Sequence, residues 1–439
     1  MKYLIFFIFL MLFSLTVYGQ EEIVTLETCL KNGLPVNNKL NRIKEETYFL
    51  KAKKEEVSSF YLPNLKLNAS YSRLSEVPDF EISLPVLPAP IKVQESIANS
   101  YQLKLGVTQP IFTGFRISAI NDAAENSYLA AVDGFSVEQN EEAFKIIHSY
   151  LNLYRLSQLL IASQENINTM EMRVEDVKNF EKNGLATKSD VLRLEVQLSN
   201  LKLAFLAIEN EYKFAIEYLS KNSGLKLNYG VKLLLPEVNQ EVNNRSVDEL
   251  VSSAIQNRKE LQKINYTIES TKNNITVAKS GYFPEIYLTS NLYYSNPNQR
   301  YFPAKAEFNE SWDVSILLQW NIFDWGATSS KVEAANHQLN GTMFMKDELT
   351  ENIRLEVLQN KLEVENLKER IKLAEIKLAQ SEEHARVITE NFKNMNATST
   401  ELAEAESNLL SSKIDLITSK SNYLLSIYKL SKSAGVMLF

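Results

Sequence analysis

Four stretches of the chain alternate apolar and polar residues with a period of two, which predicts strands with two different faces. They cover about 64–74, 101–112, 285–294 and 312–323, and a proline-rich loop at 78–90 separates the first two. Each stretch is roughly ten residues long, the length of a tilted strand that crosses a lipid bilayer. Four strands cannot close a barrel, and lipid does not tolerate open strand edges. If these strands cross a membrane, several copies of the chain must contribute to one barrel.

The fourth predicted strand carries a tryptophan near each end of its apolar face, Trp312 and Trp320. Tyr293, Tyr294 and Tyr301 crowd the loop beside it. Aromatic residues at both interfaces are typical of a membrane barrel. A soluble sandwich with an aromatic core is the alternative, and it fits any one strand taken alone. Four such strands in a chain that is otherwise helical favour the membrane.

Long stretches with helical spacing and almost no breaks follow the second strand of each pair, from about 118 to 182 and from about 328 to 393. Roughly 65 residues of helix make a rod of about 100 Å. A short polar turn follows each rod, and the chain returns as a helix of roughly 36 residues, or about 55 Å. We expect an opening helix at about 25–60 to stack end to end with a returning helix, so that together they match the rod.

The returning helices carry apolar residues at alternating spacings of three and four, which predicts coiled-coil seams. The first seam consists of Val191, Leu194, Leu198, Leu201, Phe205, Ile208, Tyr212, Ala215 and Leu219. The second alternates large with small residues, so we expect closer helix packing there; it consists of Leu402, Ala405, Leu409, Ser412, Leu416, Ser419 and Tyr423.

The second half of the chain resembles the first. Leu-Pro at 62–63 is matched by Phe-Pro at 283–284, 221 positions later. Gln-Pro-Ile-Phe at 109–112 is matched by Trp-Asn-Ile-Phe at 320–323, 211 positions later. Self-similarity on this scale indicates a duplicated structural unit. The sequence therefore predicts repeat one at 20–224, a linker at 225–245 and repeat two at 246–439.

The N-terminus reads as a secretory signal peptide over residues 1–19, with an apolar run at 4–15 and cleavage after Gly19. An uncleaved anchor is the alternative, but the run is shorter than the roughly 20 residues that a membrane-spanning helix needs. Cys29 is the only cysteine and lies within a predicted helix. We expect it to be a small buried residue without a disulfide.

Composition adds two restrictions. Only 12 glycines and 11 prolines occur in 439 residues, which favours long helices. The formal net charge is −7, and the absence of a basic patch argues against a nucleic-acid partner. The three histidines stand apart, and we find no phosphate-binding loop or nucleophile motif. We therefore expect no catalytic residues, no metal site, no cofactor and no enzymatic activity.

The whole pattern resembles the TolC family of outer-membrane efflux and secretion ducts. The opening at Val24–Leu30 resembles the usual start of that family, and the turn at Asn183–Val191 is similar to its most specific local motif. The turn occurs a second time near Asn394–Thr398. The resemblance implies a mainly α chain with a small β part, in which long coiled-coil helices build an α-barrel.

The resemblance also implies an assembly. Four strands from each chain of a homotrimer would form a twelve-stranded transmembrane β-barrel in the outer membrane of a Gram-negative bacterium, in contact with its lipid. The helices would cross the periplasm, and the linker would form a belt around them. The far tip would meet a periplasmic adaptor, or membrane fusion protein, which holds an inner-membrane pump of the RND or ABC type. The docking tip would consist of Gly184, Leu185, Ala186, Thr187, Asn396, Ala397 and Thr398.

Two residues of the second tip match positions where the family often carries aspartates. Glu401 and Glu404 lie at i and i+3 on one helix face, and in a trimer they would ring the periplasmic aperture with carboxylates that attract cations. The alternative is a solvated helix face.

Asp190 matches a family aspartate that helps to hold the tip closed. Its usual tyrosine and arginine partners are replaced here by Phe392 and Ala397, which cannot form those bonds. We therefore expect a different closing contact or a tip that opens more readily. A helix cap is the alternative role for Asp190. Gly184 suits a left-handed turn, and Asn396 is the residue that we expect to replace it in the second copy.

The sequence thus predicts a passive exit duct of a tripartite efflux pump, gated at its periplasmic tip. An exit duct for type I protein secretion is one alternative. A secreted coiled-coil structural or adhesive protein without a pore is another, and the seams are its best support. The substrate stays open, because in such systems the pump selects it.

Overall fold

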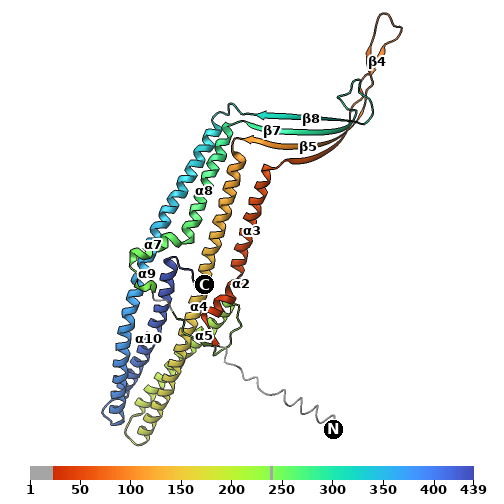
Figure 1. Ribbon diagram of the computed structural model, residues 1–439. Coiled ribbons are helices and arrows are strands. Elements are labelled where there is room, and N and C mark those ends of the chain that lie inside the picture. The colour runs from red at the N-terminus through yellow and green to blue at the C-terminus, as the bar shows by residue number, and fades with distance from the viewer. Residues whose placement is uncertain (1–22, 238–240) are drawn as a thin grey trace, which may run out of the picture. The chain divides into compact units, whose positions relative to one another are not determined.

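The computed structural model describes residues 23–237 and 241–439, so the predicted signal peptide lies outside the described residues. The fold is mainly α-helical, as expected, and Figure 1 shows its elements. In chain order they are β1 (Ile23–Val24), α2 (Leu26–Val36), α3 (Asn38–Ser58), β2 (Asn64–Arg73), β3 (Phe80–Ile82), β4 (Ile91–Gln94), β5 (Asn99–Thr113), α4 (Arg116–Lys182), α5 (Lys188–Ser223), β6 (Lys232–Leu233), α6 (Glu241–Asn244), α7 (Val247–Asn257), α8 (Lys259–Lys279), β7 (Glu285–Asn296), β8 (Asn309–Gln319), α9 (Ala327–Lys393) and α10 (Ser399–Ser433).

The chain forms two compact units, and each takes segments from both halves of the sequence. The helical unit contains the described residues up to Lys44 together with Gly134–Leu261 and Glu348–Phe439. The sheet unit contains Glu45–Asp133 and Gln262–Asp347. The same order of two helices, two long strands, a long helix and a returning helix occurs twice along the chain.

The sheet unit is built on four antiparallel strands in the order β2-β5-β7-β8 (Figure 1). The central pair joins the two halves of the chain, because β5 comes from the first and β7 from the second. The register between them shifts at Pro110, which has no backbone N–H for the ladder. The strand expected at 312–323 ends at Gln319, so Trp320 follows it. Strand β3 lies within the loop expected at 78–90 and pairs with β4 just after it, forming a short hairpin that the proline content concealed.

The expected single opening helix at 25–60 is wrong, because Asn37 separates α2 from α3. Asn37 is extended, and its side-chain oxygen accepts from the backbone N–H groups of Lys39 at 2.9 Å and Leu40 at 3.1 Å, which caps α3. Pro35 in the last turn of α2 contributes to the break. Arg258 lies 221 positions later and separates α7 from α8 in the same extended conformation, without a proline. The break is therefore a feature of both copies.

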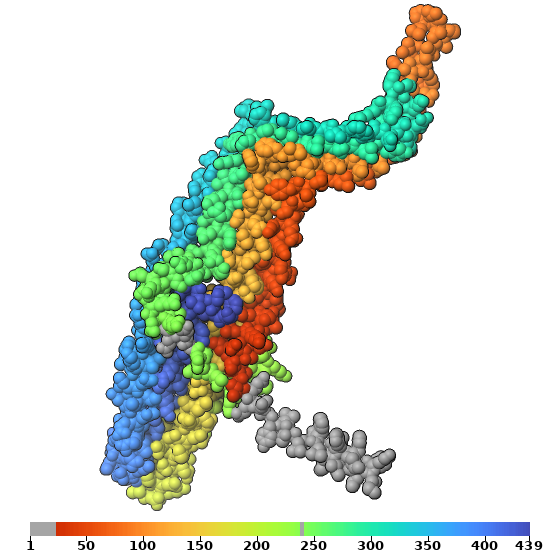
Figure 2. Space-filling model, in the orientation of Figure 1, coloured from red at the N-terminus to blue at the C-terminus, as the bar shows by residue number. Residues whose placement is uncertain are grey.

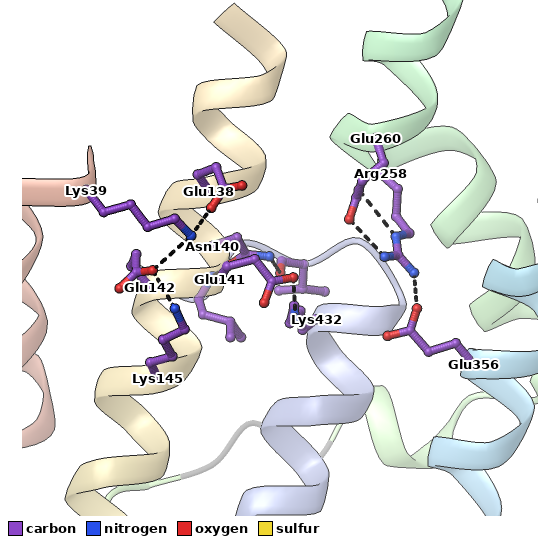
Figure 3. Close-up of polar contacts among 12 residues, drawn as sticks. Lys39, Glu138, Asn140, Glu141, Glu142, Lys145, Arg258, Glu260, Glu356 and Lys432 are labelled. Atoms are coloured by element: carbon purple, nitrogen blue, oxygen red, sulfur yellow. Dashed lines mark hydrogen bonds and ion pairs between the residues drawn. The ribbon is translucent and has the colours of Figure 1, made fainter. Parts of the chain in front are cut away.

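Ion pairs fix both breaks to a long helix, as Figure 3 shows. The Lys39 ammonium lies 2.5 Å from Glu138 and 3.3 Å from Glu142, both on α4. The Arg258 guanidinium lies 2.5 Å from Glu356 on α9, and it also contacts Glu260. Burial opposes the charged form of Arg258, but hydrogen bonds to these two carboxylates outweigh it and raise its pKa. The contacts with the long helices could not be predicted from the sequence, because the partners lie about 100 positions apart along the chain.

The main core of the helical unit surrounds Tyr150 on α4, whose side chain is fully buried. Its hydroxyl lies 2.6 Å from the carbonyl oxygen of Leu234 and 2.9 Å from that of Val24. These contacts hold the linker beside the parallel pair of β1 and β6. Cys29 is fully buried in the same core, as expected, and burial raises the pKa of its thiol to about 12.

Gly33 on α2 makes a close contact with α5 that a larger residue would disrupt. A Cβ atom there would lie 2.4 Å from the backbone oxygen of Asn222 and 2.8 Å from Ile146. We expect Gly33→Ala to lower the free energy of unfolding by about 1–3 kcal/mol through overpacking. Gly341→Ala is the matched control, because that helical glycine has nothing within 4 Å and should gain about 1 kcal/mol. Urea unfolding of the purified protein in detergent measures both, and equal stabilities would contradict the tight contact.

Candidate functional sites on the sheet and at the helical turns

One face of the four-stranded sheet is apolar and uncovered. Leu67, Leu105, Leu292 and Trp312 form one row across all four strands, each paired with the next. Val107 and Ile286 of this face are half-buried, and the other large residues are exposed, from 38% for Leu288 to 76% for Ile316. The exposed large side chains of this apolar face are Leu65, Leu67, Tyr71, Tyr101, Leu103, Leu105, Leu288, Leu292, Tyr294, Trp312, Val314, Ile316 and Leu318. A face of this size cannot stay in water and needs an apolar partner.

The opposite face of the sheet is polar. Asn291 donates from its side-chain amide to Asp313 at 2.8 Å, and the Lys104 ammonium lies 5.4 Å from the ring of Tyr293. Successive residues of a strand point to opposite faces. Tyr293, one of the expected membrane-interface aromatic residues, therefore lies on this polar face and points away from Tyr294. Tyr294 does belong to the apolar face.

The two tryptophans occupy exposed positions near different ends of β8. Trp312 is 68% exposed and lies inside the strand near its start. Trp320 is 51% exposed and lies just beyond the end of the strand, where its indole N–H donates to the backbone oxygen of Tyr282 at 3.2 Å. Both indoles are thus available to a surrounding medium at opposite ends of one strand.

The turns that join the long and returning helices have the same construction in both copies. Thr187 caps the start of α5 and Thr398 caps the start of α10, and each forms a capping box with the residue three positions on. That residue is Asp190 in the first copy and Glu401 in the second, 211 positions later. The cap role is therefore established for Asp190. Glu401 has the same role in the second copy: it accepts hydrogen bonds from the backbone N–H and the hydroxyl of Thr398, which lower its pKa.

The left-handed residue of the second turn is Met395, with φ of 63°, and the expectation for Asn396 is wrong. In the first turn Gly184 has φ of 72°. The N–H of the next residue closes each turn, from Leu185 to Phe180 and from Asn396 to Asn391, both at 2.8 Å. This closure places the left-handed conformation one residue before Asn396.

A methionine in this conformation carries steric strain, so Met395→Gly should stabilise the second turn. We expect a gain of about 1 kcal/mol in the free energy of unfolding. Asn396→Gly is the control, because Asn396 does not have a positive φ and should gain nothing. Thermal unfolding of both purified variants tests this, and a gain from Asn396→Gly alone would contradict the assignment.

A hydrogen bond joins the two helical turns within the chain. Asp190 accepts from the hydroxyl of Ser399 on α10 at 2.5 Å, and Arg193 on α5 contacts Thr400. Figure 2 shows the two turns next to each other at the end of the helical unit. The Ser399 bond, followed by the Thr187 bonds, lowers the pKa of Asp190. Sequence reasoning named Asp190 but missed Ser399, because a serine after a capping threonine looks like an ordinary turn residue.

Apolar packing supports this contact. The rings of Phe180 and Phe392 lie 5.8 Å apart, and Phe392 is buried. Ala186 and Ala397 are half-buried against the same cluster, so the expected docking tip is not uniformly open. Its remaining members are exposed: Gly184, Leu185, Thr187, Asn396 and Thr398.

Further from the turns, a polar cleft of about 380 Å³ lies between α4, α9 and α10. Arg173 lines it and binds buried Glu406 at 3.2 Å and Thr389 at 3.2 Å. Asn166 also lines it, and its buried side-chain oxygen has no hydrogen-bond partner. Glu404 lies near Glu406 in sequence, but its side chain is exposed. No sequence signal links Arg173 to Glu406, because the two residues are 233 positions apart.

Two other features are absent from the described residues. Residues 23–237 and 241–439 contain no group of three or more histidine, cysteine or acidic side chains that could hold a metal ion. In the same part of the chain, no helix is long and apolar enough to cross a bilayer.

Comparisons of the sequence with known proteins find similarity to outer membrane efflux proteins. The family model described as outer membrane efflux protein matches residues 250–436. The outer membrane efflux protein BepC of Brucella suis biovar 1 (strain 1330) is 19% identical over 334 residues, which is 75% of this chain and 71% of that protein.

Two solved structures show how far the similarity of fold extends. The outer membrane protein VceC from Vibrio cholerae has a TM-score of 0.79 at 15% identity, over 94% of this chain and 97% of that one. The open state of the Neisseria gonorrhoeae MtrE outer membrane channel has a TM-score of 0.76 at 16% identity, over 94% and 89%. The fold is thus shared along nearly the whole chain.

Proposed function

We propose that the chain is a member of the family of outer membrane efflux proteins, and that three copies of it form the passive outer-membrane channel of a tripartite efflux pump. The family and the fold are those of channel proteins, and we assign the chain no catalytic role. The pump that supplies energy and selects the cargo belongs to other chains.

The uncovered apolar face of the sheet carries this proposal. Lipid would cover that face, while the polar face with Asn291 and Asp313 would line water. The edge strands β2 and β8 have no further strand partners among the described residues. Lipid excludes open edges, so β8 of one copy would pair with β2 of the next. Twelve strands, four from each copy, would then close the barrel.

The helical unit supports association of copies as well. Helix α5 carries a second apolar stripe, separate from its packed seam, at Leu192, Val196, Leu203, Leu206 and Phe214, all of which are exposed. Helix α9 carries exposed Leu355, Leu362, Leu373 and Ile376. From Leu192 to Leu206 and along the α9 stripe, the residues are 3, 4, 7 or 11 positions apart, which suits coiled-coil packing. We expect α5 of one copy to pack against α9 of its neighbour, which would enclose a helical conduit.

The exposed turns would meet the periplasmic adaptor. Leu185 is 58% exposed at the first turn, and the polar cleft at Arg173 and Asn166 offers hydrogen-bonding groups between the two helical hairpins. A helical partner could place its own side chains in that cleft. Such a partner would connect the channel to an RND pump. An ABC transporter in that place would give the alternative, type I protein secretion, and the structure of this chain would serve both.

Conductance across planar bilayers tests the channel function. Purified protein should appear as a trimer by native mass spectrometry and should insert to give discrete current steps. Trimers that insert but carry no current would support the alternative of a structural protein without a pore. A monomer that stays in the soluble fraction would overturn the membrane assignment.

Glu404 provides a sharper test of the aperture. The capping box already engages Glu401, whereas Glu404 is exposed, so we expect Glu404 to contribute more to the ring of carboxylates. Glu404→Gln should lower the cation preference by roughly twofold in reversal-potential measurements. Glu369→Gln is the control, because it removes an exposed charge from α9 far along the chain from the turn. Equal effects of the two changes would show that only net charge matters.

A further inference from the structure

The hairpin of β3 and β4 projects beyond the end of the four-stranded sheet, as Figures 1 and 2 show. It is inserted between β2 and β5, at the ends of these strands that lie away from the helices. Polar contacts brace its base. Asp79 accepts from the backbone N–H of Ser96 at 2.8 Å and pairs with the Lys92 ammonium at 2.5 Å. These contacts therefore fix the conformation of the base of the hairpin.

The hairpin has one apolar and one charged face. Ile82 pairs with Ile91 on one face, and Glu81 pairs with Lys92 on the other. Phe80 shares the apolar face and is 57% exposed, while Ile82 and Ile91 are 42% and 47% exposed. The tip adds Val86, which is 90% exposed. A two-stranded hairpin is marginally stable in water unless something covers its apolar face.

We propose that the hairpins of three copies pack against one another through these apolar faces, over the outer mouth of the channel. This inference rests on the proposed trimeric barrel. Each hairpin lies between two strands of the same barrel, so the three would stand at equivalent points of one rim. Each hairpin would then meet the other two at an effective concentration far above that of separate molecules in solution. The charged faces would point outward to water, and the apolar contact would narrow the exit.

The charge of the hairpin favours the hairpins of other copies over lipid as the partner of its apolar face. Glu81 and Lys92 are the only charged residues from 80 to 94, so the hairpin itself carries no net charge. Segments that dip into a membrane surface are usually anchored by free lysine, arginine or tryptophan. Here the one lysine is paired with Asp79, and the span contains neither arginine nor tryptophan. The hairpin therefore presents an apolar, uncharged surface without membrane anchors. Such a surface fits the same surface of another copy of the chain better than it fits lipid.

Cross-linking between copies tests the contact. Ile82→Cys and Val86→Cys place thiols on the apolar face and at the tip, and Glu81→Cys is the matched neighbour on the charged face. The natural Cys29 is fully buried and should not react. Treatment of detergent-purified trimers with a short bis-maleimide should link the first two variants into dimers at least roughly tenfold more than Glu81→Cys. Native mass spectrometry of the same samples reports whether the trimer is present.

The outcomes separate the two proposals. Trimers in which neither Ile82→Cys nor Val86→Cys forms links would overturn the hairpin contact and leave the channel proposal standing. Loss of the trimer from wild-type samples would instead overturn the channel proposal. A fluorophore on Val86→Cys that spin-labelled lipids quench in reconstituted vesicles would show that lipid covers the hairpin, which also contradicts the contact between copies.

Discussion

Ile316→Arg should nearly abolish the amount of assembled protein in the outer membrane. Ile316 lies on β8 in the middle of the apolar face and is 76% exposed, so its side chain would meet the lipid interior. An arginine at the middle of a bilayer on the lipid face of a barrel costs about 2–4 kcal/mol. The trimer would bear this cost once for each copy. Quantification of trimer in the outer-membrane fraction of an expressing strain measures the effect.

Ser315→Arg is the matched control for that experiment. Ser315 is the neighbour of Ile316 on the same strand, so its side chain points to the polar face. In the barrel it would face water, and we expect trimer close to the wild-type amount. Equal losses from both changes would mean that the strand itself tolerates no arginine. Loss from Ser315→Arg alone would mean that the polar face is the covered one, which would reverse the proposed orientation of the sheet.

The sequence predicted the strands well because each face obeys a strict two-residue period. Leu65 and Leu67 on β2, like Val314 and Ile316 on β8, lie on the expected face. The same period separates Tyr293 from Tyr294, since adjacent residues of a strand cannot share a face. The break at Arg258 escaped prediction, because no proline or glycine lies beside it and its ion pairs with Glu260 and Glu356 form only in the folded chain.

The contacts at the helical turns could not be read from the sequence in the same way. The capping boxes have a local pattern of threonine followed three residues later by an acid, which is recognisable. The bond from Ser399 to Asp190 joins residues 209 positions apart, and no periodicity connects them. Resemblance to a family pointed to Asp190 as part of a closing contact, but it could not supply the partner, because the familiar partner positions hold Phe392 and Ala397.

Ser399→Ala should increase the conductance of the trimer by loosening its tip. A hydrogen bond to a charged group is worth about 1.5–3 kcal/mol, and partial exposure of Asp190 reduces this toward the lower end. About 1.4 kcal/mol would raise the open fraction roughly tenfold. The change leaves both capping boxes intact, because they depend on Thr187 and Thr398. Ser189→Ala is the control, since Ser189 is an exposed neighbour of Asp190 that forms no part of the contact.

Acid should have the same effect as Ser399→Ala on the wild-type channel. Hydrogen bonds from Ser399 and then Thr187 lower the folded-state pKa of Asp190, so its contact is fully formed above the ordinary aspartate pKa of about 4. The contact is lost as pH falls through the lowered value, when the carboxylate takes up a proton. Conductance should therefore rise in strong acid in wild type and much less in Asp190→Asn, which is already neutral. An Asp190→Asn channel that opens with acid as the wild type does would assign the acid response to other carboxylates and remove Asp190 from the closing contact.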